Sequence, residues 1–198
     1  MALTLIKEDG TGKVDANSYA SAVDGDAYFD GHLYATAWTA ASTGNKEKAL
    51  VFATRLIDSQ FQFNGWKAHD AQALQWPRER CPDVDKSLIT ISVLVPFLGT
   101  YVDADLVPTA VVNATCEMAR ELLIADRTSA PPGEGIATLH TGHTDAGVGG
   151  NAPSSDNTTT VYSKSDTRPI ISHVAQAMLA KYGALMTSGS GPVRLVRA

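Results

Sequence analysis

The sequence predicts a mainly α fold, in which a small antiparallel helical bundle carries a long loop or β-hairpin insertion and an extended C-terminal arm. Apolar residues recur at steps of three and four in several separate stretches, which is typical of amphipathic helices. Residues 129–160 are rich in Gly, Ser, Thr, Asn and Asp and are too polar to build a core. Residues 188–198 begin with a Ser-Gly-Ser-Gly linker. We therefore expect a helical domain over residues 1–187 and a flexible arm over 188–198.

Composition narrows the class of protein. The chain has 198 residues, of which 44% are hydrophobic and 19% charged, values that exclude a fully disordered chain and a coiled-coil rod. No apolar run approaches the roughly 20 residues that span a bilayer, and no signal peptide is visible, so we expect a protein made in the cytoplasm that does not enter a membrane. The net charge of −5 is unfavourable for general nucleic-acid binding, which depends on phosphate neutralisation.

The first two helices lie in the N-terminal third of the chain. Residues 2–6 alternate and could form a short strand, after which Asn17 or Ser18 can cap a helix over about residues 21–34. The second helix begins after a cap among residues 42–45 and ends near Phe61. Its apolar stripe is the clearest periodic signal in the chain: Ala49, Leu50, Ala53, Leu56, Ile57 and Phe61.

Two more helices follow an irregular segment. Residues 64–106 show no clear period, and 89–101 could be a strand or a buried loop. Within this segment, Trp76-Pro77-Arg78 is expected to hold the irregular chain against the second and third helices. The third helix starts at Pro108 and stops before Ser129, and the last runs from about Pro169 to Leu185. A hairpin over 129–160 would pair residues 136–139 with 158–162.

Candidate chemical sites are weak. His140 and His143 lie near Asp145, but no cysteine completes a zinc set, and Cys81 and Cys116 lack ligand spacing, so we expect reduced thiols. Residues 10–13, Gly-Thr-Gly-Lys, lack the spacing of a phosphate loop. No catalytic set of Ser, His and Asp or of Cys and His can be assembled. We therefore expect no enzyme activity, no metal and no cofactor.

The C-terminal segment has two interpretations of nearly equal weight. It alternates apolar and basic residues, and such a peptide can add a strand to a partner's sheet or enter a groove. It can equally be a frayed tail. The residues expected at an interface with a neighbouring subunit or another partner are Val193, Arg194, Leu195, Val196 and Arg197.

Several motifs appear in an order that resembles the tailed-phage head–tail connector (adaptor) proteins, some of which are labelled DnaT-like single-stranded-DNA-binding proteins. The specific blocks are Ala-Thr-Arg-x-Ile-Asp at residues 53–58 and Gln-x-Leu-x-Trp-Pro-Arg at 72–78, and the match covers roughly residues 15–125. The structural motif residues that the resemblance highlights are Arg55, Asp58, Trp66, Trp76, Pro77 and Arg78.

The resemblance implies a structural virion protein at the head–tail interface. Such proteins form a ring, commonly a dodecamer, which binds the portal protein and a tail or nozzle protein. Genomic DNA passes through the ring without specific binding. The acidic balance of this chain suits a DNA channel, because an attractive wall would retain the genome through its phosphates.

The alternative is a single-stranded-DNA-binding module. It would use Trp38, Trp66 or Trp76 as a stacking surface for bases beside a basic groove. The available basic clusters are small: Lys46 with Lys48 and Arg55, Arg78 with Arg80, and Arg194 with Arg197.

Overall fold

The computed structural model describes residues 3–83, 101–129, 138–144, 155–161 and 169–186. The chain divides into two compact units. The first comprises residues 1–127 and 171–198, and the second comprises residues 128–170. The predicted C-terminal arm and most of residues 89–101 lie outside the described residues.

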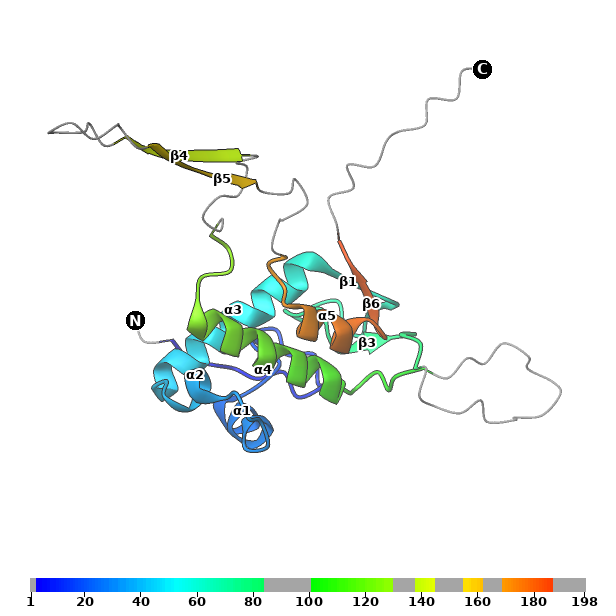
Figure 1. Ribbon diagram of the computed structural model, residues 1–198. Coiled ribbons are helices and arrows are strands. Elements are labelled where there is room, and N and C mark those ends of the chain that lie inside the picture. The colour runs from blue at the N-terminus through cyan, green and yellow to red at the C-terminus, as the bar shows by residue number, and fades with distance from the viewer. Residues whose placement is uncertain (1–2, 84–100, 130–137, 145–154, 162–168, 187–198) are drawn as a thin grey trace, which may run out of the picture. The chain divides into compact units, whose positions relative to one another are not determined.

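The first unit is built around three helices, α3, α4 and α5, of which α4 contacts both of the others. Helix α4 packs against α3 and α5, and it also contacts α1 and α2 (Figure 1). The helices are α1 (Ala22–Phe29), α2 (Thr36–Thr39), α3 (Thr43–Gln60), α4 (Thr109–Ile124) and α5 (His173–Leu179).

Side-chain caps explain where these helices begin. Ser21 forms a reciprocal capping box with Asp24 at the start of α1. Ser42 accepts a hydrogen bond from the backbone N–H of Asn45, which confirms the predicted cap of α3. Pro108 directly precedes α4, so this helix begins one residue later than predicted. Ser172 caps α5 in the same manner, through the N–H of Ala175.

Short strands join segments that are distant in the sequence. β1 (Phe61–Phe63) continues directly from α3 and pairs antiparallel with β6 (Gly183–Leu185). β2 (Trp66–Lys67) pairs antiparallel with β3 (Arg78–Glu79). The prediction of a mainly α helical bundle is therefore wrong, because the described residues form a mixed α/β structure with five helices and three two-stranded antiparallel sheets.

The length of the strands explains this error. Strands of two or three residues are too short to show the alternation by which a strand is recognised in a sequence. The last helix was predicted to reach Leu185, but it stops at Leu179, and the chain becomes β6 instead. At Gly183 the strands approach closely, since a Cβ there would lie 2.2 Å from the carbonyl oxygen of Gln62. Only glycine allows this approach.

The core of the first unit lies between the helices and the β1–β6 pair. Its largest fully buried side chains include Trp38, Trp76, Tyr19, Leu50 and Ile57. Among the described residues, no helix has both the length and the apolar character needed to cross a bilayer.

The second unit contains one antiparallel pair. β4 (Thr138–Thr144) pairs with β5 (Ser155–Val161), with Thr138 opposite Val161 and Thr144 opposite Ser155. His140 and His143 lie in β4, where the register places His140 opposite Thr159 and His143 opposite Asp156.

Candidate nucleic-acid interface

The three tryptophans of the chain differ sharply in exposure. Trp38 and Trp76 are fully buried, whereas 51% of Trp66 is exposed to solvent. A base can stack only on an accessible ring face. Of the three tryptophans considered as stacking surfaces, the structure therefore leaves Trp66.

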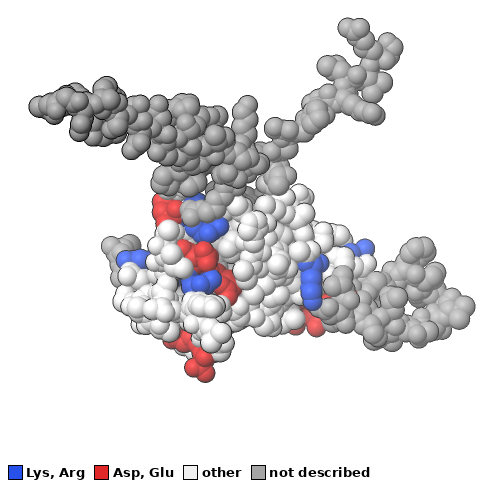
Figure 2. Space-filling model, viewed as in Figure 1, with Lys and Arg blue, Asp and Glu red and all other residues white. Residues whose placement is uncertain are grey.

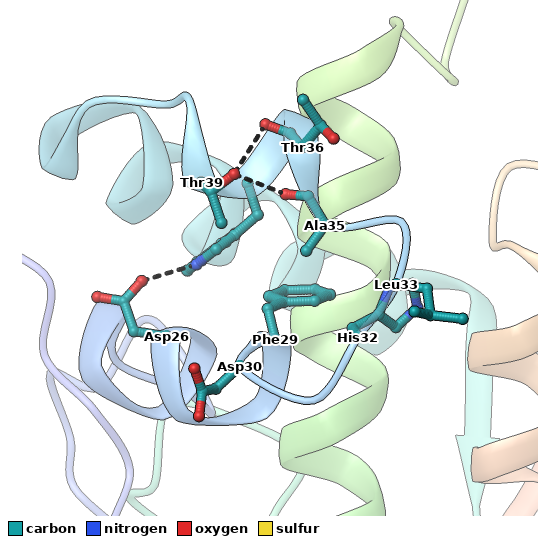
Figure 3. Close-up of a pocket in the computed structure, with 9 residues that line it drawn as sticks. Asp26, Phe29, Asp30, His32, Leu33, Ala35, Thr36 and Thr39 are labelled. Atoms are coloured by element: carbon teal, nitrogen blue, oxygen red, sulfur yellow. Dashed lines mark hydrogen bonds between the residues drawn. The ribbon is translucent and has the colours of Figure 1, made fainter.

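Trp38 is unavailable because it fills the space between α1 and α2. Its indole N–H donates to Asp26 Oδ1 at 2.8 Å, and its ring lies 5.2 Å from that of Phe29. Figure 3 shows the residues that line an open hollow beside it, which has a volume of about 430 Å³ and includes Asp26 and Asp30 in its lining. The carboxylate of Asp30 makes this hollow unfavourable for a phosphodiester chain, and that of Asp26 is already paired with Lys46.

Trp76 is enclosed by aromatic residues. Its ring packs edge to face with those of Phe63 and Tyr182, both at 5.6 Å between ring centroids. Its buried indole N–H meets no acceptor among the described residues. Trp76 thus serves to anchor the irregular segment in the core.

Trp66 is held at its edge and covered on one face. Its indole N–H donates to Glu79 Oε2 at 3.1 Å, across the β2–β3 pair. The exposed guanidinium of Arg80 lies 5.2 Å from the centroid of the ring, which is within the range of a cation–π interaction. We call this the Trp66–Arg80 pair.

Local backbone geometry sets up this pair. Gly65 has φ of 72°, and a Cβ there would lie 2.1 Å from the carbonyl oxygen of Glu79. Arg80 itself has φ of 52°, a conformation that is rare for residues other than glycine. The turn at residue 80 directs the chain so that the Arg80 side chain returns over Trp66.

Arg78 fixes the same segment from the inside. Its guanidinium donates to three backbone carbonyls in the turn between β1 and β2, those of Phe63 (3.3 Å), Asn64 (2.8 Å) and Gly65 (2.6 Å). It also donates to the backbone and side-chain oxygens of Gln75, both at 3.0 Å. Because all these donors are used, Arg78 is a structural residue, and the predicted Arg78–Arg80 cluster offers only Arg80 to a ligand.

A buried carboxylate holds the start of the Trp-Pro-Arg sequence. Tyr19 donates its hydroxyl hydrogen to Asp58 Oδ1 and accepts from the backbone N–H groups of Gln75 (3.0 Å) and Trp76 (3.2 Å). Asp58 Oδ2 accepts a second bond from the N–H of Gln75 at 3.1 Å. Burial raises the pKa of Asp58 to about 6, against the opposing effect of these hydrogen bonds and of the charges on Lys67 and Arg78.

Most other cations of the first unit are already paired. Lys46 contacts Asp26 at 2.6 Å and lies over the Trp38 ring, so it is lost from the predicted cluster with Lys48 and Arg55. The face in Figure 2 accordingly shows acidic and basic side chains next to one another. Other pairs among the described residues are Lys7 with Asp24, Lys13 with Asp9, Arg120 with Glu117 and Glu121, and Arg127 with Glu121.

The N-terminal glycine turn does not bind a phosphate either, because a side chain fills it. The fully buried carboxylate of Glu8 accepts hydrogen bonds from the backbone N–H groups of Gly10 (2.9 Å), Gly12 (2.9 Å) and Lys13 (2.8 Å). The donors that could hold an external anion are thus used within the chain.

Comparison with known proteins identifies the family of the chain. A family model described as "Putative DnaT-like ssDNA binding protein" matches residues 3–198. The chain belongs to this family. No curated protein and no solved structure matches it.

The DnaT-like family assignment corrects the resemblance drawn from the sequence. The family model covers nearly the whole chain, including residues 126–198, which the resemblance did not reach. Nothing in the comparisons is a head–tail connector, so the assignment to the tailed-phage connectors is wrong. The shared blocks at 53–58 and 72–78 have a structural explanation instead, because Asp58, Trp76 and Arg78 fix the segment that presents Trp66.

The structure separates the predicted motif residues into two groups. Asp58, Trp76, Pro77 and Arg78 lie together inside the first unit, whereas Arg55 and Trp66 are exposed. Sequence reasoning did not identify the contribution of Tyr19 or Glu79, nor the place of Arg80 on the Trp66 ring, since each depends on contacts between distant residues. The interface residues 193–197 lie outside the described residues.

Proposed function

We propose that this member of the DnaT-like family binds single-stranded DNA and that the Trp66–Arg80 pair is a stacking site for one base. The observation that carries the proposal is the contrast in exposure, with two tryptophans fully buried and the third half exposed beneath a guanidinium. The description of the family supports the same ligand.

The chemistry of the pair suits an unpaired base. Base stacking on an aromatic side chain contributes about 1–3 kcal/mol per base and tolerates any sequence, since every base has a π face. The ring of Trp66 is oriented by Glu79 before a ligand arrives, so little conformational entropy is lost on binding. Arg80 supplies a positive charge next to the ring for the adjoining phosphate.

The charge of the protein predicts that binding is weak and only modestly dependent on salt. The net charge is −5, and Arg80 is the cation in contact with the Trp66 ring, because the ammonium of Lys67 donates to the backbone carbonyl of Gln72 at 3.2 Å. One phosphate contact gives a slope of log K against log salt of about −0.7 for a single strand. We therefore expect sequence-tolerant binding at low salt that decreases gradually as salt is added.

An affinity measurement with a labelled 20-nucleotide oligothymidylate tests the proposal. Fluorescence anisotropy at low salt is expected to show binding by the wild type and a loss of about 5- to 150-fold for Trp66→Ala, equivalent to 1–3 kcal/mol. Tyr34→Ala is a matched control, since Tyr34 is also an exposed aromatic residue, at 76% exposure. Absence of binding by the wild type, or equal affinities for wild type and Trp66→Ala, would refute the proposal.

Other expectations from the sequence remain predictions. These are a ring-forming role in a virion, its portal and tail partners, and a non-enzymatic function. The role in a virion rested on a resemblance that the family assignment has overturned.

A further inference from the structure

We propose that the exposed face of α3 formed by Lys48, Phe52 and Arg55 is a second contact for the same single strand. This inference rests on the proposed function and extends it from one base-stacking site to a track with two contacts. We call these three residues the α3 face.

The three residues share one side of the helix. Their spacing of four and then three positions places each next to the following one on the helix surface. All three are exposed, and 40% of the Phe52 side chain is open to solvent. The residues between them are directed into the core: Ala49, Leu50, Val51, Ala53 and Thr54.

The two cations of the α3 face are available to a ligand. Within the part of the chain that the structure describes, neither Lys48 nor Arg55 makes an ion pair. Asp58, the acid nearest to Arg55 on the helix, is directed inward to Tyr19. The α3 face and the Trp66–Arg80 pair therefore share one feature, a cation next to an exposed aromatic ring, while Trp66 is also bonded to the carboxylate of Glu79.

A hollow next to Phe52 gives a flat ring a place to bind. It has a volume of about 240 Å³ and lies between α3 and the end of α4. Compared with three other hollows in the described residues, this one has no carboxylate in its lining, whereas the others contain Asp24, Asp58, or Asp26 with Asp30. Its lining is Asn45, Lys48, Ala49, Phe52, Leu122 and Leu123.

This lining matches a nucleotide in its chemistry. Phe52 and the two leucines offer apolar surface to the base, Asn45 offers an amide to its polar edge, and Lys48 offers a charge to the phosphate. A carboxylate-free hollow is compatible with a polyanion, in contrast to the hollow between α1 and α2 described above.

One strand can reach both contacts. From Phe52 to Gln60 the helix rises about 12 Å, and residues 61–66 extend at most about 20 Å further. The two sites are therefore separated by no more than about 32 Å, a distance covered by about ten nucleotides at 3.4 Å each. Joining two weak contacts on one strand raises the affinity above that of either contact alone.

The experiment compares a short with a long oligothymidylate. Quenching of Trp66 fluorescence reports binding at Trp66 itself, because the other two tryptophans are buried. With a 4-nucleotide strand, we expect Trp66 fluorescence to be quenched as in the wild type in two variants, Phe52→Ala and the double variant Lys48→Gln/Arg55→Gln. With a 20-nucleotide strand, each is expected to lose fivefold or more in affinity. With the 20-nucleotide strand, Arg80, Lys48 and Arg55 together predict a slope of log K against log salt of about −2.1, and the double variant is expected to reduce it to about −0.7.

Two control variants separate these effects from changes elsewhere. Tyr34→Ala removes an exposed aromatic ring, and Lys13→Gln removes a cation that is paired with Asp9. Both are expected to bind the long strand like the wild type. If the α3-face variants also bind it like the wild type while Trp66 is still quenched, the second contact is refuted and the proposed function stands. If the wild type shows no quenching with either strand, both proposals are refuted.

Discussion

The buried carboxylate of Asp58 makes the stability of this protein depend on pH in a direction opposite to that of most acids. Burial raises its pKa from 3.8 to about 6. The folded state therefore binds the proton more tightly than the unfolded state does. It follows that the free energy of unfolding decreases as pH rises from about 4 to about 6 and changes little above that.

The expected magnitude follows from the two pKa values. Between pH 7 and pH 5, protonation of Asp58 in the folded state adds about 1.3 kcal/mol to the free energy of unfolding. The total between full ionisation and full protonation is about 3 kcal/mol. Asp9, Asp24 and Asp26 have lowered pKa values, so their opposite effect appears as pH falls below about 4.

Urea unfolding at pH 5, 6 and 7 measures this dependence. Comparison with Asp58→Asn removes contributions from other titrating groups, since the two proteins share all of them. When the pH is lowered from 7 to 5, the free energy of unfolding of the wild type is expected to rise by about 1.3 kcal/mol relative to that of Asp58→Asn. A difference between the two proteins that is independent of pH, or that changes in the opposite direction, would refute the account of Asp58.

Two further substitutions test the packing that presents Trp66. Arg78→Lys replaces a guanidinium that donates to several carbonyls with a single ammonium, and we expect a loss of about 2–4 kcal/mol in urea unfolding. No loss would show that the guanidinium is not required. Gly183→Ala places a Cβ 2.2 Å from a backbone oxygen of β1, and we expect a loss of about 1–3 kcal/mol in the same assay. Gly44→Ala is its control, because a Cβ there meets nothing within 4 Å, and it should be neutral or stabilising by up to about 1 kcal/mol. Equal effects of the two alanines would contradict the close approach of β1 and β6.

The sequence predicted those parts of the fold that depend on local signals. The start of α3 at Ser42 and its end near Phe61 follow from a cap and a periodic stripe, both of which are visible within about 20 residues of sequence. The short helix α2 and the pairing of β1 with β6 depend on contacts across the whole chain and were missed. The local apolar pattern could not show that residues 183–185 complete a sheet with residues 61–63.

The site was predictable only in part, and for a similar reason. Trp66 and Trp76 look alike in the sequence, and each lies next to basic residues. Their difference in exposure arises from Tyr182, which covers Trp76, and from Arg78, which holds the turn that leaves Trp66 outside. The sequence grouped Lys48 and Arg55 with Lys46 but did not point to Phe52, and the hollow beside Phe52 requires α4 and could not be anticipated.

The indole N–H signals in a ¹H–¹⁵N correlation spectrum test the central claim most directly. The three tryptophans give three such signals, and Trp66→Phe identifies the one that belongs to Trp66. On addition of a 20-nucleotide oligothymidylate at low salt, we expect the Trp66 signal to shift, while those of the buried Trp38 and Trp76 stay in place. A Trp66 signal that does not move while the strand binds would contradict the account.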